Sequence, residues 1–325
     1  MTVAPALLAT ASTKSLPPLA QARIGFIGAG RLGKALAWRM HEAGLCVAAV
    51  SSATPASAQA LAARIPDCET TRAQEVIDRC DLVFVATPDG AIATTASSLR
   101  WRPGMAAVHC SGVTEVDALE VARSHGACIG GFHPMQTFGD PQAVAASLKG
   151  CTITLEADEP LNMLLVALVE RIGCHVNRLP AGMRGRYHAA AGFTSQFINA
   201  LFAEAAVVWK SWGADESDAL RALLPLARGT LASIESAGIA GGMPGPVSRG
   251  DVASVEKHVA ALAPLGDEML AFYRLMCGRT VPIARRRGAI DESVADRIRA
   301  ALAPLEVEAS RHKPSIVGGA ACRKE

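Results

Sequence analysis

The sequence predicts an α/β protein in which an N-terminal, doubly wound and mostly parallel sheet is followed by an all-α C-terminal domain. Three observations predict it: apolar runs alternate with amphipathic segments over residues 23–180, a glycine-rich turn follows the first run, and strand-like runs end near residue 180. Alternating strands and helices are typical of parallel sheets with right-handed crossovers. A chain of 325 residues has room for two domains at roughly 150 residues each.

The predicted elements follow in chain order. Mostly apolar strands, typical of a sheet covered on both faces, are expected at residues 23–27, 46–50, 82–86, 105–109, 127–132, 151–155 and 175–179. Helices between them are expected at residues 32–43, 57–65, 91–99, 114–125 and 161–172. In the second half we expect one long helix over 187–212, a helix from Asp215 that Pro225 kinks or interrupts, a Gly/Pro-rich loop over 238–250, and helices over 252–262, 267–277 and 291–302. These elements predict an extension over 1–20, the sheet domain over 21–180, the helical domain over 181–308 and a frayed tail over 309–325.

Composition excludes several classes of protein. With 50% hydrophobic and 19% charged residues, the chain is not wholly disordered. A net charge of +2 and 4% aromatic residues argue against a nucleic-acid partner. The densest apolar stretch, residues 161–169, is shorter than the ~20 residues of a membrane span, and residues 1–20 lack the positive segment of a secretory signal. Nine cysteines without a C-x-x-C pair indicate reduced thiols and a cytoplasmic protein.

A glycine-rich turn follows the first predicted strand and opens the first helix. It reads Gly28-Ala29-Gly30-Arg31-Leu32-Gly33, the G-x-G-x-x-G pattern of Rossmann dinucleotide-binding sites. Gly28 permits the tight turn, Gly30 lets a pyrophosphate approach the backbone, and Gly33 allows close packing of helix and strand. The N–H groups of the helix then bind the anion. We interpret the turn as a dinucleotide site, against the alternative of a purely structural turn.

The residues after the second strand bear on the choice of cofactor. An acidic side chain there would bind the ribose 2′-hydroxyl of NAD, but this strand ends in Ser51 and Ser52. Hydroxyl groups can donate to a 2′-phosphate and Arg31 can supply positive charge, so the sequence favours NADP(H) over NAD(H).

Three loops follow strands at the edge where ligands of doubly wound sheets bind. Thr87-Pro88-Asp89 is expected to cover the cofactor, with an ordinary capped turn as the alternative. His109-Cys110-Ser111-Gly112 and His133-Pro134-Met135-Gln136 are expected at the catalytic mouth. Histidine suits proton transfer because its unperturbed pKa lies near 6.5. His133 is favoured over His109 because the following proline holds its backbone extended.

Two further segments in the helical domain are candidates. His188, Gly192, Ser195 and Asn199 share one helix face, with Tyr187 and Gln196 beside it. This face either meets a ligand or packs closely against another helix. Arg249 either binds a substrate carboxylate or pairs with Asp251 on the surface. No paired-cysteine or H-x-x-x-H motif predicts a metal site.

Four ordered motifs resemble a known family. HCSG (109–112), GGFHPMQTF (130–138), RYHAAAGFTSQ (186–196) and GPVSRGD (245–251) are similar to those of bacterial Rossmann-like and DUF2520 domain-containing proteins. The family is similar to the 6-phosphogluconate, 3-hydroxyisobutyrate, pyrroline-5-carboxylate and ketopantoate enzymes. The resemblance implies an NADP oxidoreductase whose helical domain carries a catalytic side chain and forms a homodimer. The chain departs from these relatives at His188 and Gly192, which stand where 3-hydroxyacid dehydrogenases have Lys and Asn, and at Gln196 and Pro244.

Two functions follow as alternatives. The first is a reductase that transfers a hydride between NADP(H) and a small carbonyl or imine carboxylate, a ketopantoate-like 2-oxo acid among them. Cys110, Ser111 and Gly112 would lie near the nicotinamide, and His133 or His188 would move the proton with Ser111 in the catalytic group. Substrate contacts are expected from Gln136, Tyr187, Ser195, Gln196 and Arg249. The second is a non-catalytic dinucleotide sensor, which the same fold would support.

Overall fold

The structure is a computed structural model that describes residues 15–304, so most of the expected extension and the whole expected tail lie outside the described residues. Residue contacts divide the chain into a unit that ends at Phe197, here the sheet unit, and one that begins at Ile198, here the helical unit. Residue 180 marks the point where strands give way to helices. The first helix after it, α8 (Arg184–Phe193), still belongs to the sheet unit.

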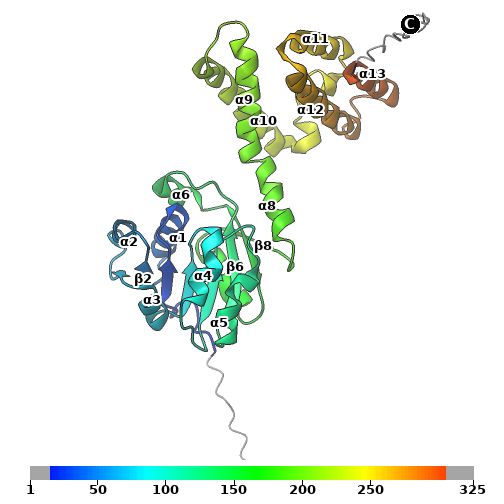
Figure 1. Ribbon diagram of the computed structural model, residues 1–325. Coiled ribbons are helices and arrows are strands. Elements are labelled where there is room, and N and C mark those ends of the chain that lie inside the picture. Colours follow the sequence, from blue (N-terminus) through cyan, green and yellow to red (C-terminus); the bar gives the residue numbers. More distant parts are fainter. Residues whose placement is uncertain (1–14, 305–325) are drawn as a thin grey trace, which may run out of the picture. The chain divides into compact units, whose positions relative to one another are not determined.

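The sheet unit is built on one eight-stranded sheet in the order β3-β2-β1-β4-β5-β6-β7-β8 (Figure 1). The strands are β1 (Ile24–Ile27), β2 (Val47–Ser51), β3 (Glu69–Thr70), β4 (Leu82–Val85), β5 (Ala106–His109), β6 (Cys128–Pro134), β7 (Thr152–Ala157) and β8 (His175–Arg178). Only the β6–β7 pair is antiparallel among these strands. The predicted doubly wound, mostly parallel sheet is therefore confirmed. The exposed two-residue strand β3 was not predicted.

The helices of the sheet unit connect these strands, except α8, which follows the last strand. They are α1 (Arg31–Glu42), α2 (Pro55–Ala62), α3 (Ala73–Arg79), α4 (Ile92–Ser97), α5 (Glu120–Ser124), α6 (Pro141–Ser147), α7 (Leu161–Arg171) and α8. Neither α3 nor α6 was predicted, because a helix of seven residues is too short to show a full amphipathic repeat. The helix expected over 91–99 is α4, preceded by a 3₁₀ turn over Asp89–Ala91. The helix expected over 114–125 is split into a 3₁₀ turn over Val116–Leu119 followed by α5.

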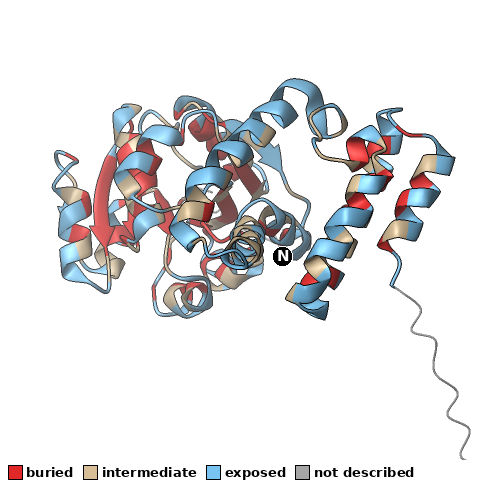
Figure 2. Cartoon of the chain, turned by 90° about the horizontal axis from the view of Figure 1, so that it is seen from above, coloured by how far each residue is buried: buried red, intermediate tan, exposed pale blue. Residues whose placement is uncertain are grey.

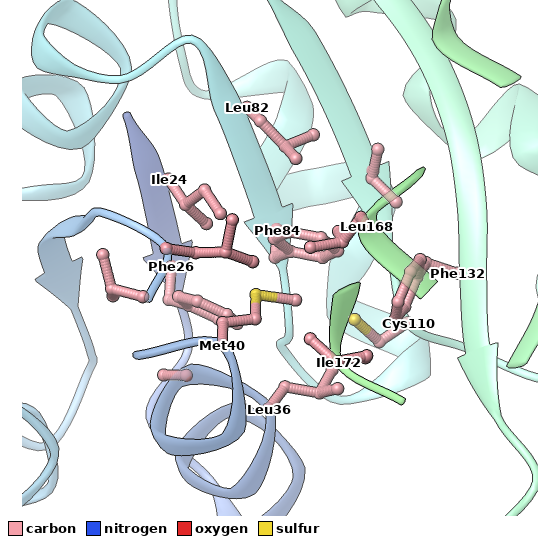
Figure 3. Close-up of a cluster of buried hydrophobic side chains, with 14 of the residues drawn as sticks. Ile24, Phe26, Leu36, Met40, Leu82, Phe84, Cys110, Phe132, Leu168 and Ile172 are labelled. Carbon is pink, nitrogen blue, oxygen red and sulfur yellow. The ribbon is translucent and has the colours of Figure 1, made fainter. Parts of the chain in front are cut away.

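Side chains that alternate along each strand fill two cores, one on each face of the sheet. On β4, Leu82 and Phe84 enter one core while Val83 and Val85 enter the other. Phe84 is fully buried and stacks on Phe26 with ring centroids 5.2 Å apart (Figure 3). Burial of a side chain of this size stabilises the fold by about 2 kcal/mol. Strands β1, β2, β4 and β5 are accordingly buried along their whole length, whereas the edge strands β3 and β8 are largely exposed (Figure 2).

The helical unit contains α9 (Gln196–Lys210), which begins in the sheet unit, α10 (Glu216–Gly241), α11 (Val252–Leu262), α12 (Asp267–Arg286) and α13 (Glu292–Leu302). Its core lies among α11, α12 and α13 and includes Val255, Val281 and Ile298, all almost fully buried. Helix α11 has the predicted bounds because the Asp251 carboxylate accepts a hydrogen bond from Ser254 N at 3.0 Å and caps it.

Three expectations for these helices were wrong in detail. The single helix expected over 187–212 is interrupted at Thr194 and Ser195, between α8 and α9. Helix α10 continues through Pro225, and the non-helical residue inside it is Gly238, with φ 70° and ψ 175°. Helix α12 extends beyond the expected residue 277 and through Pro282 to Arg286. The glycine breaks the helix because it adopts a left-handed φ that other residues avoid.

Within residues 15–304, one helical stretch, Arg184–Lys210, is long and apolar enough to cross a membrane when judged by length and composition alone. It spans α8 and α9, and 6% of its most apolar window is buried. Polar residues such as Ser195 and Asn199 interrupt this stretch, so it is not the densest apolar run of the sequence.

Candidate active site

The glycine-rich turn has the close contacts that its sequence predicts. Gly28 has a φ of 110°, and a Cβ there would lie 2.4 Å from the carbonyl oxygen of Ala86. A Cβ on Gly33 would lie 2.4 Å from the carbonyl oxygen of Gly28. A Cβ on Gly30, in contrast, would meet nothing within 4 Å. Two glycines therefore bring the backbone together, while the middle one leaves open space in front of it.

The start of helix α1 presents the backbone N–H groups of its first turn to that open space. Its N-cap, Gly30, has no side-chain hydrogen bond to the helix, and its first turn has no acidic residue. Nearby, the hydroxyl of Thr87 is buried without a hydrogen-bond partner in the structure. An uncapped helix start and an unsatisfied hydroxyl fit an anionic dinucleotide, because both gain a partner when the anion binds.

The end of β2 opens onto a cavity of about 340 Å³. Its lining includes Ser52, Gln59, Thr71, Arg72 and Glu75. The guanidinium of Arg72 donates to Glu75 Oε1 through Nε at 2.9 Å and through NH2 at 2.7 Å. Sequence reasoning placed Ser52 here but missed Arg72 and Glu75, because they follow a strand of only two residues. Ser51 contributes its carbonyl oxygen, which accepts from Gly28 N at 2.8 Å.

The HCSG segment forms a tight buried turn after β5. The Ser111 hydroxyl accepts from the backbone N–H groups of Val113 and Thr114 at 3.2 and 3.0 Å. The backbone N–H of Ser111 donates to His109 Nδ1 at 3.2 Å. Cys110 packs in the core, where burial raises the pKa of its thiol to about 12 (Figure 3). The side chains of this segment therefore build the turn, and its backbone and Gly112 face the site.

Two imidazoles converge on Gly112. A Cβ on this glycine would lie 2.8 Å from His133 Nε2 and 2.5 Å from His188 Nδ1. The two rings are nearly perpendicular, with centroids 5.8 Å apart. His133 Nδ1 lies 2.7 Å from the hydroxyl oxygen of Tyr187. The structure thus brings together His133, Tyr187 and His188, which sequence reasoning had proposed from separate segments.

The two strand-end histidines are neutral at pH 7. Burial, helped by His188 and Arg184 and opposed by Asp89, lowers the pKa of His133 to about 4. Burial, again helped by Arg184, lowers the pKa of His109 to about 3. His109 has no exposed surface, whereas the His188 side chain is exposed. His109 is therefore placed to support the turn, and His133 and His188 are placed to meet a ligand.

Arg184 was not predicted, although it connects the parts of this site. Its side chain is fully buried, with Nε 2.5 Å from Glu156 Oε2 on β7. Its NH1 donates to the carbonyl oxygen of Ser111 at 2.8 Å. The guanidinium lies against β6, where a Cβ on Gly131 would approach NH2 to 1.7 Å. Its spacing of three and four residues from Tyr187 and His188 was the available signal, since these positions share a helix face.

The remaining predicted substrate-binding residues make contacts of their own. Gln136 is exposed, and its Oε1 accepts from Thr137 N at 2.9 Å. Ser195 donates to the Ala191 carbonyl oxygen at 2.8 Å, and Gln196 lies against the buried Gly192. Arg249 belongs to the helical unit, in the 3₁₀ turn η3 (Val247–Arg249). Within residues 15–304, no three His, Cys, Asp or Glu side chains are grouped to hold a metal ion.

Comparisons with known proteins agree with this architecture. A family model described as a Rossmann-like domain matches residues 10–134, and one described as a domain of unknown function, DUF2520, matches residues 151–280. No curated protein matches the chain.

Solved structures share the fold over most of the chain. A "putative NADP oxidoreductase" from Bacteroides fragilis is 25% identical, with a TM-score of 0.60 over 86% of this chain and 99% of that one. A reductive aminase from Aspergillus terreus in complex with NADPH and ethyl-5-oxohexanoate is 17% identical, with a TM-score of 0.58 over 86% and 99% of the two chains. A pyrroline carboxylate reductase from Plasmodium falciparum with NADP bound is 11% identical, with a TM-score of 0.52 over 88% and 100%. The two domain matches confirm the resemblance found in the motifs: a segment that matches the Rossmann-like model is followed by one that matches the DUF2520 model.

Proposed function

We propose that the protein is an NADP(H)-dependent oxidoreductase that transfers a hydride to or from a small carbonyl or imine substrate carrying a carboxylate. A 2-oxo acid of the ketopantoate type is the preferred substrate, and a cyclic imine acid is the second. The observation that carries the proposal is the convergence of His133 Nε2 and His188 Nδ1 on Gly112, at the strand ends beside the dinucleotide turn. Two imidazole rings that meet beside one glycine suit a reaction that adds or removes a proton together with a hydride.

The dinucleotide would be held by the uncapped start of α1, by Thr87 and by the cavity beyond β2. When bound, NADPH supplies the hydride. Ser52 and Arg72 are the proposed partners of its 2′-phosphate, because a hydroxyl and a guanidinium are both donors to phosphate oxygens. The Glu75 carboxylate accepts hydrogen bonds from the Arg72 guanidinium in the structure. We therefore expect the phosphate to replace this carboxylate as the partner of Arg72.

Protein groups then act on the substrate. His133 donates a hydrogen bond to the carbonyl or imine, and His188, which is exposed, exchanges the proton with solvent. The Ser111 hydroxyl is assigned to the turn, since it accepts from two backbone N–H groups. Gln136, Tyr187, Ser195, Gln196 and Arg249 remain predicted substrate contacts, with Arg249 as the partner of the carboxylate.

The proposal is tested by following NADPH oxidation with a panel of 2-oxo acids, cyclic imines and ketone–amine mixtures. The change His188→Ala should abolish turnover and keep NADPH binding, whereas His175→Ala, an exposed position on β8, should leave both unchanged. Tight NADPH binding without turnover of any substrate would instead identify a dinucleotide sensor. Normal turnover in His188→Ala would refute the role of that histidine.

The proposal includes a cytoplasmic homodimer formed through the helical unit. Within this unit, α9 and α10 enclose an apolar groove of about 470 Å³ lined by residues such as Leu201, Leu223 and Leu231. Leu226 and Leu231 on α10 are 64% and 57% exposed. Contiguous apolar surface of this kind is typical of interfaces between copies of a chain. A reducing compartment agrees with the eight free cysteines of the described residues.

A further inference from the structure

Three side chains on neighbouring strands lie side by side behind the candidate site. His133 on β6 is paired with Thr154 on β7, and Thr154 is paired with Asn177 on β8. Directly paired residues project from the same face of a sheet, so the three side chains form one row. Tyr187, from α8, reaches this row with its hydroxyl group.

Polar contacts connect the row from end to end. The amide Nδ2 of Asn177 donates to Thr154 Oγ1 at 3.0 Å. The Thr154 hydroxyl interacts with the Tyr187 side chain and opposes the rise of its pKa that burial causes, which is the effect of a donor. The Tyr187 hydroxyl oxygen lies 2.7 Å from His133 Nδ1. Thr154 is completely buried, so its hydroxyl has no access to solvent.

The number of protons available sets the direction of these bonds. An amide nitrogen can only donate, so the Thr154 oxygen accepts from Asn177. Among the described contacts of the Thr154 side chain, the other partner is the Tyr187 oxygen, so the Thr154 proton goes to Tyr187. The single proton of Tyr187 then goes to His133 Nδ1. A neutral imidazole that accepts at Nδ1 carries its proton at Nε2, which is the nitrogen that lies beside Gly112.

We infer that Asn177, Thr154 and Tyr187 are positioning residues that fix His133 as its Nε2–H tautomer, so that His133 acts as a neutral hydrogen-bond donor to the reacting carbonyl or imine. The burial that keeps His133 uncharged at pH 7 supports this role. A neutral imidazole in this role polarises the substrate without giving up its proton, as known enzymes illustrate. The proton that the reaction adds or removes is therefore assigned to His188. The role of His133 in the reaction rests on the proposed function. The tautomer of His133 does not, because it can be measured without any substrate.

The test reverses the chain of hydrogen bonds at its exposed end. In Asn177→Asp the carboxylate can only accept, so Thr154 must donate to it, Tyr187 must donate to Thr154, and His133 Nδ1 must donate to Tyr187. Nitrogen NMR of ¹⁵N-histidine-labelled protein at pH 7 reads the tautomer directly. We expect Nε2–H in the wild type, Nδ1–H in Asn177→Asp, and a mixture in Tyr187→Phe. Thr152→Val, on the same strand and outside the row, should keep Nε2–H.

Turnover provides the second measurement. Asn177→Asp should lower kcat by about tenfold or more while the NADPH affinity stays within about twofold, because one hydrogen bond to the substrate is lost. An Nδ1–H tautomer in the wild type would overturn the inference, whatever the activity. A switched tautomer with unchanged kcat would overturn the positioning role. If the wild type turns over no substrate while the tautomers behave as expected, the proposed function fails and the assigned hydrogen-bond direction stands.

Discussion

Arg184 and Glu156 form a buried ion pair, with Nε and Oε2 2.5 Å apart, that joins helix α8 to strand β7. The side chains are 0% and 13% exposed. Burial raises the pKa of Glu156, and the Arg184 guanidinium beside it opposes that rise. Because Arg184 also donates to the carbonyl oxygen of Ser111, the pair holds the HCSG turn and the helix that carries Tyr187 and His188 in one arrangement.

Removal of Arg184 should therefore destabilise the sheet unit strongly. Arg184→Met leaves Glu156 buried without its partner, and loss of one member of a buried ion pair costs about 3 kcal/mol or more. Urea unfolding would measure this loss. The double change Arg184→Met/Glu156→Leu should recover most of it, since the unpaired charge is gone. A single variant as stable as the wild type would show that the pair does not hold the site together.

Gly112 is expected to be essential for turnover while contributing little to stability. In Gly112→Ala the new Cβ would lie 2.5 Å from His188 Nδ1 and 2.8 Å from His133 Nε2, so both rings must move. We expect kcat to fall by about a hundredfold, since small misplacements of catalytic groups have effects of this size. Gly139→Ala, where a Cβ meets nothing within 4 Å, is the matched control. Equal activity of the two variants would contradict the placement of the site.

Local signals in the sequence predicted the parts of this site that depend on one segment. The G-x-G-x-x-G turn, the helix cap at Asp251 and the loops at strand ends follow from residue types at fixed spacings. His133 was selected because strand ends of a parallel sheet lie at one edge, and His188 was selected from a pattern on one helix face. The structure places the two rings together beside Gly112.

The parts that were missed depend on contacts between distant segments. Burial of Arg184 requires the bare backbone of Gly131 on β6 and the carboxylate of Glu156 on β7, and neither is adjacent to it in sequence. The row formed by His133, Thr154 and Asn177 depends on strand register, which the pattern of apolar residues did not fix. A two-residue strand, β3, placed Arg72 beside Ser52 without a recognisable pattern of its own.

Arg72 should discriminate between the two dinucleotides. If it binds the 2′-phosphate, Arg72→Ala should weaken NADPH binding by about tenfold and leave NADH binding nearly unchanged, since a charge-assisted hydrogen bond contributes about 1.5 kcal/mol. Glu75→Gln should strengthen NADPH binding, because the carboxylate no longer competes for the guanidinium. Titrations of cofactor fluorescence would measure both effects. Parallel losses for NADPH and NADH in Arg72→Ala would show that the cavity does not bind the 2′-phosphate.

Exposed leucines on α10 should control association of the chain. Leu226→Glu places a charge on a side chain that is 64% exposed, so the isolated chain loses little stability. In an interface the same charge would be desolvated, and we expect it to convert a dimer to monomers. Light scattering after size-exclusion chromatography would report the mass, with Arg221→Glu, an exposed change on the same helix, as the control. A monomeric wild type would refute the dimer.

The buried histidines predict how stability depends on pH. The pKa of His109 is lowered to about 3 by burial and by Arg184, and that of His133 to about 4 by burial, His188 and Arg184, with Asp89 opposing. Between these values and the ordinary pKa near 6.5, the unfolded chain binds protons that the folded chain does not. Stability should therefore fall as the pH is lowered from 7 to 5, by up to about 1.4 kcal/mol per pH unit for each histidine.

One substitution isolates the contribution of His109. His109→Asn keeps an acceptor for the Ser111 N–H while removing the titrating ring, so the slope between pH 5 and 7 should decrease by about half. Hydrogen bonds lower the pKa values of carboxylates such as Asp215 and Asp251 from 3.8. These groups therefore titrate below pH 5 and do not change the slope between pH 5 and 7. Urea unfolding at several pH values would measure the slope, with the exposed His175→Asn as the control. If His109→Asn kept the full slope, His109 would not be a buried neutral group, and the pH dependence would have to arise from other residues.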